Sequence, residues 1–202
     1  GSGADTFDFT GGNPSSSDII DGGDGTDVLK VDVSLTSSST LSKMSNVENI
    51  LLNYTDASAD TTINATLFEG IEVQVADSSD GGNPTIVTLS NAKSSQAVTF
   101  DAKSGTSVDD TNDGVSLTVT LGTGVGTSSD DFTITMEEEI LLDLAVAGYE
   151  TLNIVSNVGA NTIKDLDAAA AENIVITGNK NLTLSDVDME EQSSTEVSKV
   201  DA

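Results

Sequence analysis

The stretch GGDGTDVLK, Gly22–Lys30, decides the fold. Three of its first four positions are glycine, an aspartate follows at position 27, and a large aliphatic residue stands at position 29. A glycine inside a helix or strand costs about 0.5–1 kcal/mol relative to alanine. Three glycines together therefore predict a tight turn whose backbone other residues reach poorly. The residues that follow, VLKVDV, have the pattern of a strand. The stretch thus predicts a glycine turn that runs directly into a β-strand.

The composition favours a thin β-structure and excludes several chemistries. Aromatic residues make up 3% and hydrophobic residues 36%, so a core must be built from Val, Ile, Leu and Ala, which suits stacked sheets. The formal net charge of −27 repels nucleic acid and anionic membranes, and it opposes a compact state unless cations neutralise part of it. The absence of His and Cys excludes disulfides and imidazole- or thiol-based catalysis. No apolar run approaches the roughly 20 residues of a membrane span. We expect no enzymatic activity, no nucleic-acid partner and no membrane insertion.

Short β-type runs separated by turn-rich segments fill the rest of the chain. They are rich in Thr, Val and Ile, and many alternate apolar with polar residues. Besides 27–33, these runs span 48–53, 71–77, 85–90, 97–102, 115–121, 131–136, 150–156, 173–178 and 181–185. Two segments with acidic residues near their beginnings, 137–148 and 164–173, are expected to form short helices or loops.

Four of the β-type runs begin alike, with an apolar or small residue, then glutamate, then a strand: VENILLN, IEVQVAD, YETLNIV and AENIVIT. Glu48 and Glu72 are 24 residues apart, and Glu150 and Glu172 are 22 apart. A period of this length is typical of one coil of a solenoid. We predict an all-β fold, a right-handed parallel β-solenoid (β-helix), because parallel crossovers are right-handed. A Greek-key β-sandwich is the alternative, since short strands with frequent turns also fit it.

In the solenoid, alternate strand residues face the core. The predicted inward residues are Leu29, Val31, Ile50, Leu52, Val73, Val75, Leu152, Ile154, Ile174 and Ile176.

The stretch GGDGTDVLK also matches every fixed place of the calcium-binding nonapeptide G-G-x-G-x-D-x-U-x, in which U is a large aliphatic residue. The glycines let backbone carbonyls point at an ion, the aspartate adds a carboxylate, and Leu29 fills the core. Ca²⁺ takes about 6–8 oxygen ligands. One turn cannot supply so many, so consecutive turns must share each ion.

The first residues, GSGADTFDF (1–9), provide a second turn. At an offset of 22 residues they match GGDGTDVLK at every remaining fixed place, with Phe7 opposite Leu29. Asp18 precedes the second turn, where an incoming strand would present another carboxylate. Asp24 occupies a variable place and is expected to face solvent. We predict a Ca²⁺ site formed by the carboxylates or carbonyls of Asp5, Asp18, Asp27, Gly1, Gly3, Gly22, Gly23 and Gly25.

These turns resemble those of RTX proteins, and specifically the calcium-binding S-layer and surface proteins that Gram-negative bacteria export by type I secretion. The later phrases NVENILL (46–52), GIEVQV (70–75), GYETLNI (148–154) and ENIVITGNKNLTLSDV (172–187) resemble the Thr/Val/Asn-rich β regions of that family. The resemblance divides the chain into RTX-like calcium-binding turns at 1–34 and a degenerate-repeat β-solenoid at 35–202. The chain departs from the family by having two turns in place of a long array, which indicates a fragment or processed piece of a longer protein.

The resemblance implies a structural, extracellular protein of the bacterial cell surface. Such a protein is stabilised by Ca²⁺ and assembles with other copies of itself into a layer or fibre. A segment of a large RTX adhesin is the alternative, and the non-catalytic part of a secreted enzyme is a third interpretation. Cell-surface polysaccharide is a further expected partner. The acidic turns at 77–83, 108–114 and 128–131 are either solvated loops or additional calcium sites.

Overall fold

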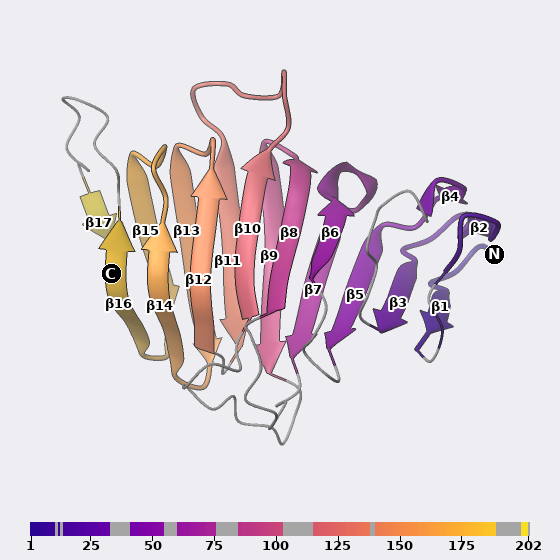
Figure 1. Ribbon diagram of the computed structural model, residues 1–202, viewed down its shortest axis with the longest axis horizontal. Coiled ribbons are helices and arrows are strands. Elements are labelled where there is room, and N and C mark those ends of the chain that lie inside the picture. The colour runs from indigo at the N-terminus through magenta and orange to yellow at the C-terminus, as the bar shows by residue number, and fades with distance from the viewer. Residues whose placement is uncertain are drawn as a thin grey trace.

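The computed structural model describes residues 1–10, 12, 14–32, 41–54, 60–75, 85–102, 115–137, 140–188 and 199–201. Within these ranges the chain forms two long parallel sheets whose strands follow one another along the long axis of the molecule (Figure 1). Odd-numbered strands lie in one sheet and, from β6 on, even-numbered strands lie in the other. The chain therefore passes from sheet to sheet and gains one rung with each pair of strands. This arrangement is a parallel β-solenoid.

The nine-stranded sheet has the order β1 (Thr6–Phe9), β3 (Val28–Asp32), β5 (Asn49–Tyr54), β7 (Gly70–Val75), β9 (Ser95–Ala102), β11 (Asp131–Glu137), β13 (Thr151–Val158), β15 (Asn173–Gly178) and β17 (Lys199–Asp201). The six-stranded sheet has the order β16 (Leu182–Asp188), β14 (Asn161–Asp167), β12 (Ile140–Ala147), β10 (Val115–Leu121), β8 (Thr85–Ala92) and β6 (Thr61–Asn64). The short strands β2 (Ile20–Asp21) and β4 (Met44–Ser45) pair with each other, and the 3₁₀ turn η2 (Ala65–Leu67) follows β6.

Parallel pairing distinguishes the two predicted architectures. Every strand pair in the described part of the chain is parallel, which excludes a Greek-key sandwich and confirms the solenoid. The right-handed sense of the crossovers stays a prediction from the general rule.

The described residues of the two segments expected to be helices or loops form strands and, at residues 168–172, a turn. Residues 140–147 are β12, and residues 164–167 end β14, before the turn that leads to β15. The interpretation of these segments as helices is wrong because strand pairing outweighs local preference: β12 pairs with both β10 and β14 and buries Leu141, Leu144 and Val146. A helix at this place would interrupt the six-stranded sheet and leave one edge each of β10 and β14 unpaired.

The core is built from aliphatic side chains that alternate with outward residues on each strand. Of the predicted inward residues, eight are buried: Leu29, Val31, Ile50, Leu52, Val73, Leu152, Ile154 and Ile174. Ile176, near the C-terminal end, is partly buried against the same core, and the side chain of Val75 lies outside the described residues. Full burial of one such side chain stabilises the fold by about 1.5–3 kcal/mol.

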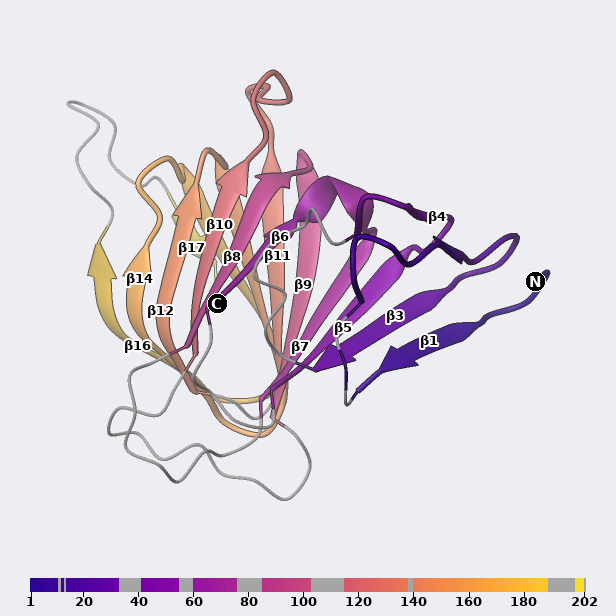
Figure 2. The same ribbon diagram turned by 45° about the vertical axis from the view of Figure 1, so that its right-hand side comes forward.

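The first rungs differ from the rest. The six-stranded sheet begins only at β6, so β1 and β3 extend beyond its edge (Figure 2), and β2 and β4 form their small sheet at this end of the molecule (Figure 1). Strand β3 pairs with β5, so the larger sheet continues across the predicted boundary between residues 34 and 35. The glycine turns therefore lie at one end of a continuous solenoid.

Candidate metal centre at the glycine turns

The two glycine turns stack in the register that their alignment predicts. Strand β1 pairs with β3 so that Phe7 lies opposite Leu29. The backbone nitrogen of Gly1 donates to the Gly22 carbonyl oxygen at 2.9 Å. The Asp24 amide donates to the Gly1 carbonyl oxygen at 3.0 Å, so the contact between the turns runs in both directions. Sequence alone therefore located the pairing of these two turns correctly.

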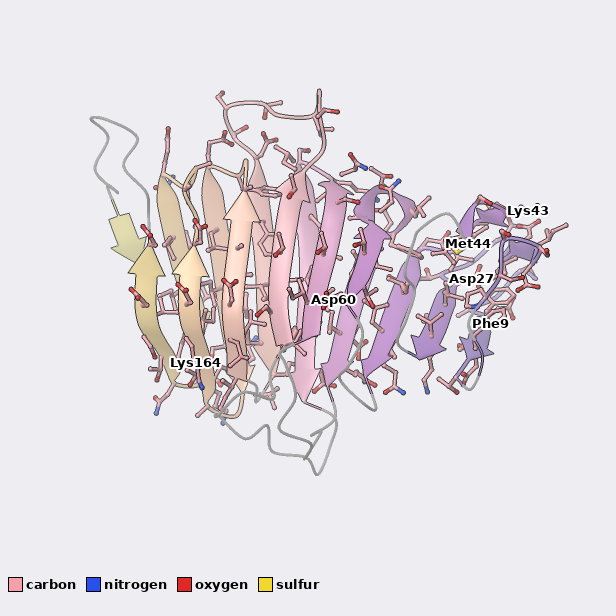
Figure 3. The ribbon with its side chains drawn as sticks, in the orientation of Figure 1. Phe9, Asp27, Lys43, Met44, Asp60 and Lys164 are labelled. Carbon is pink, nitrogen blue, oxygen red and sulfur yellow. The ribbon has the colours of Figure 1, made fainter. Side chains whose placement is uncertain are left out.

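Asp27 is the most constrained acid of the pair of turns. Its side chain is 0% exposed, and its Oδ1 accepts a hydrogen bond of 2.7 Å from the Asp5 amide. Its Oδ2 is buried without a hydrogen-bond partner. A buried carboxylate oxygen that has neither a hydrogen-bond donor nor a cation beside it lowers the free energy of unfolding. Figure 3 shows Asp27 in the first rungs of the solenoid. The unpaired oxygen fits a hard cation such as Ca²⁺, which is bound by oxygen ligands.

The glycines allow the turns to approach this carboxylate closely. A Cβ atom at Gly22 would overlap the Asp27 carboxylate and the Asn46 carbonyl oxygen. Gly23 has φ of 90°, a left-handed value that favours glycine, and a Cβ atom there would overlap the backbone of Gly1. The glycine-rich composition therefore follows from close backbone packing between successive turns.

The other predicted site residues occupy different surroundings. Asp5 is partly exposed, with Oδ2 at 3.4 Å from the Gly1 nitrogen. Asp18 is exposed, and its Oδ2 accepts hydrogen bonds from the Ser15 amide at 2.7 Å and the Ser15 hydroxyl at 3.1 Å. The structure thus brings Asp5 to Asp27 while the Asp18 carboxylate closes its own turn. Asp24 is exposed, as predicted from its variable place.

Sequence reasoning missed a third turn, residues 45–48, which packs on the second. The Gly22 amide donates to the Ser45 carbonyl oxygen at 3.1 Å, and the Asn46 carbonyl oxygen lies against Gly22. Asn46 has φ of 52°, a conformation that asparagine adopts more readily than most residues. This turn lacks the glycines of the nonapeptide, so the motif could not reveal it. The only sequence feature that could have indicated this turn is the phrase V-E-N-I at its end, which resembles the start of the other strands.

An acid at the end of three of the turns, Asp27, Glu48 or Glu150, connects successive rungs. The Asp27 carboxylate accepts from the Asp5 amide, 22 residues earlier. The Glu48 carboxylate accepts from the Asp27 amide at 2.8 Å, 21 residues earlier, and that of Glu150 accepts from the Asp130 amide at 2.8 Å, 20 residues earlier. We call Asp5, Asp27, Glu48, Asp130 and Glu150 the acid column. It explains why an acid precedes so many strands.

The predicted glutamate repeat is right in one half of the chain and wrong in the other. Thr151 pairs with Asn173, which puts Glu150 and Glu172 at equivalent places. Asn49, in contrast, pairs with Gly70, so the residue equivalent to Glu48 is Glu69. Glu72 lies inside β7, opposite Leu51. Glu69 and Glu72 both lie near the start of β7, and only the strand pairing shows that Glu69 is the one at the turn.

Replacing Glu150 by Ala tests the acid column. The change leaves the Asp130 amide without its charged acceptor, so we expect a loss of about 1.5–3 kcal/mol in the free energy of unfolding. Glu172→Ala is the matched control, because this side chain is exposed at an equivalent place, and its cost should stay within about 0.5 kcal/mol. Urea denaturation measures both values. Equal losses would show that the carboxylate does not support the rung.

A second line of acids crosses the outer side of the six-stranded sheet. Asp143 on β12 pairs with Asp165 on β14, which pairs with Asp186 on β16. We call these three residues the aspartate ladder. Burial raises the pKa of Asp143, and the negative charges of Asp165 and Asp167 raise it further. Adjacent strands are about 4.8 Å apart, so like charges repel along the ladder.

Acidification from neutral pH should stabilise the protein in the presence of a chelator. A raised pKa means that folded Asp143 binds its proton more tightly than the unfolded chain, so stability increases as the pH falls through the folded pKa. The lowered pKa values of Asp8 and Asp21 oppose this only at more acidic pH, once those groups take up protons. The melting temperature should be higher at about pH 4.5 than at about pH 7. Asp143→Asn should reduce that difference. A melting temperature that falls steadily over this interval would contradict the assignment.

Comparisons with protein-family models, with curated proteins and with solved structures each gave no match. The resemblance to RTX surface proteins therefore rests on the motif residues themselves. Among the described residues, no three acidic side chains are grouped as metal ligands. Any cation at Asp27 would therefore depend largely on backbone carbonyl oxygens. The described part of the chain contains no helix long and apolar enough to span a membrane.

Proposed function

We propose that this chain is a calcium-stabilised structural segment of an extracellular bacterial surface protein that assembles with further copies into a layer or fibre. The observation that carries the proposal is the buried, unpaired Oδ2 of Asp27 inside two stacked glycine turns. A parallel solenoid that begins with such turns combines a cation-dependent end with a long, repetitive body. This combination suits an architectural role better than a catalytic one.

Calcium would act where the turns meet. Asp27 supplies the buried carboxylate, and the Asn46 carbonyl oxygen lies against Gly22 together with it. Asp5, Asp18 and the remaining turn glycines stay as predicted contributors. Each bound Ca²⁺ offsets two of the 27 net negative charges and connects consecutive turns. Folding of the first rungs is therefore expected to depend on calcium.

The outermost strands of the described sheets support the proposal of self-assembly. At the N-terminal end, Phe7 and Phe9 are only partly buried on edge strand β1. At the other end, Ile176, Leu182 and Leu184 are also only partly covered. Edge strands of a parallel sheet are templates for another strand. Contact between two different ends is heterologous, and where its rotation does not close a ring it propagates into a fibre or layer.

Electron microscopy of the purified protein tests this function. With millimolar calcium we expect filaments or sheets, and with chelator we expect dispersed particles. A Phe7→Asp, Phe9→Asp double variant places charges on the partly buried face of β1 and should remain dispersed with calcium. The exposed change Thr6→Asp on the same strand is the control. Dispersed wild-type protein in calcium would contradict assembly and favour the alternative, an adhesin segment.

A further inference from the structure

A hollow of about 250 Å³ lies on the outer side of the nine-stranded sheet, where the strands leave the glycine turns. Strands β3, β5, β7 and β9 line it. Ile50 and Ile71 in its lining are buried core residues, and the other lining residues alternate with the core and face outward. We call it the outer hollow. Gly70 helps to create it, because this residue has no side chain on a strand position between Asn49 and Ala97.

The outer hollow has an apolar part and a part with hydrogen-bond acceptors. Val28 and Leu51 provide aliphatic surface. Three further lining residues, Glu72, Asn49 and Thr99, have side chains that can accept hydrogen bonds through a carboxylate, an amide oxygen and a hydroxyl. Glu72 lies directly between Leu51 and Thr99 across the sheet. A ligand in the hollow would therefore meet aliphatic surface beside a carboxylate.

The negative charge at the outer hollow is not neutralised by a nearby cation among the described residues. Gln74 Nε2 donates to Glu72 Oε1 at 2.8 Å and to Asp101 Oδ2 at 3.4 Å, so one amide holds two carboxylates side by side. Lys30, on the strand beyond Leu51, has its Nζ 3.9 Å from Asp8 Oδ2. Burial raises the pKa of Glu72, and the charges of Asp101 and Glu137 raise it further. A bound cation would relieve this repulsion.

We propose that the outer hollow binds a primary alkylammonium group, the chemistry of a lysine side chain or of a free alkylamine. Such a group carries three N–H donors and one positive charge, which match the three acceptors and the Glu72 carboxylate. Its alkyl stem packs on Val28 and Leu51. Calcium fits this place poorly, because it requires about six or more oxygen ligands and one side of the hollow is aliphatic. The lining of the hollow includes neither Asp27 nor any turn glycine of the calcium site proposed above.

Titration of the 202-residue protein with n-butylammonium tests the proposal, followed by NMR of the Val28 and Leu51 methyl groups. We expect saturable shifts of these methyl signals, with millimolar affinity, at an ionic strength that screens non-specific attraction to the acidic chain. n-Butanol has the same stem without charge, and tetramethylammonium has the charge without N–H donors. Both should bind clearly more weakly.

Variants identify the groups that bind the ammonium. Glu72→Gln keeps the size of the side chain and should weaken n-butylammonium binding by about tenfold or more. Thr99→Val removes one acceptor and should cause a smaller loss. Asp165→Asn changes the net charge equally on the other sheet and should leave affinity unchanged. Circular dichroism confirms that each variant is folded.

The results distinguish a protein lysine from a free amine as the natural ligand, and they also show when the proposal is wrong. Binding of Nα-acetyl-lysine methylamide as tightly as n-butylammonium supports a protein lysine as the natural occupant, and weaker binding supports a free amine. Absence of saturable methyl shifts, equal binding of n-butanol, or equal losses in Glu72→Gln and Asp165→Asn would overturn the proposal.

Discussion

Calcium is expected to raise the melting temperature of the wild-type protein by roughly 5–10 °C. Binding to the folded state alone contributes about 2.7 kcal/mol at a hundredfold excess over Kd, and in a chain of this size each kcal/mol shifts the melting temperature by about 2–4 °C. Magnesium should have a much smaller effect, because it requires a tighter octahedron than the turns provide. The measurement is thermal unfolding with calcium, with magnesium and with chelator.

The variant Asp27→Asn should lose most of this calcium response. Asp27 has the buried, unpaired oxygen, so the charge that attracts the cation disappears with the substitution. Stability in chelator should change little or increase, because the variant no longer buries an uncompensated charge. Asp24→Asn removes the same charge from an exposed place in the same turn and should keep the full response. Equal responses in both variants, or equal melting of wild type in calcium and chelator, would refute the site.

The core variant Ile154→Ala is expected to lower the free energy of unfolding by about 2–5 kcal/mol. Ile154 is 0% exposed and lies between Ile134 on β11 and Ile176 on β15. Truncation leaves a cavity between two rungs. In a solenoid each rung contacts only its neighbours, so the core cannot compensate from elsewhere. Urea denaturation, with the slope of the transition compared between variants, measures the loss.

Val155→Ala is the matched control for this variant. Val155 is the next residue on β13 but faces outward and is only partly buried. Its truncation should cost less than about 1 kcal/mol, because much of the side chain already contacts water. Similar losses for the two variants would mean that the inward and outward faces of β13 have been assigned incorrectly.

The local sequence pattern predicted the structure correctly where a position accepts only one kind of residue. Such positions are the glycines at close backbone contacts and the aliphatic residues that face the core. The glycines at 22 and 23 are required by close contacts between turns, so the motif identified the pairing of the first two rungs. Alternating aliphatic residues identified the inward face of β3, β5, β13 and β15, because a strand exposes only one of its faces to the core. The acid before β13 and β15 likewise marked equivalent places on successive rungs.

Other features were decided by contacts between segments far apart in the chain. Glu69 and Glu72 are equally plausible beginnings of a strand, and only the pairing of Asn49 with Gly70 selects Glu69. Residues 140–147 form a strand because they pair with both β10 and β14 inside the six-stranded sheet. The third turn at residues 45–48 and the outer hollow have no local signature. Strand register is a non-local property: it depends on which rungs lie side by side, and that information exists only after the sheets have formed.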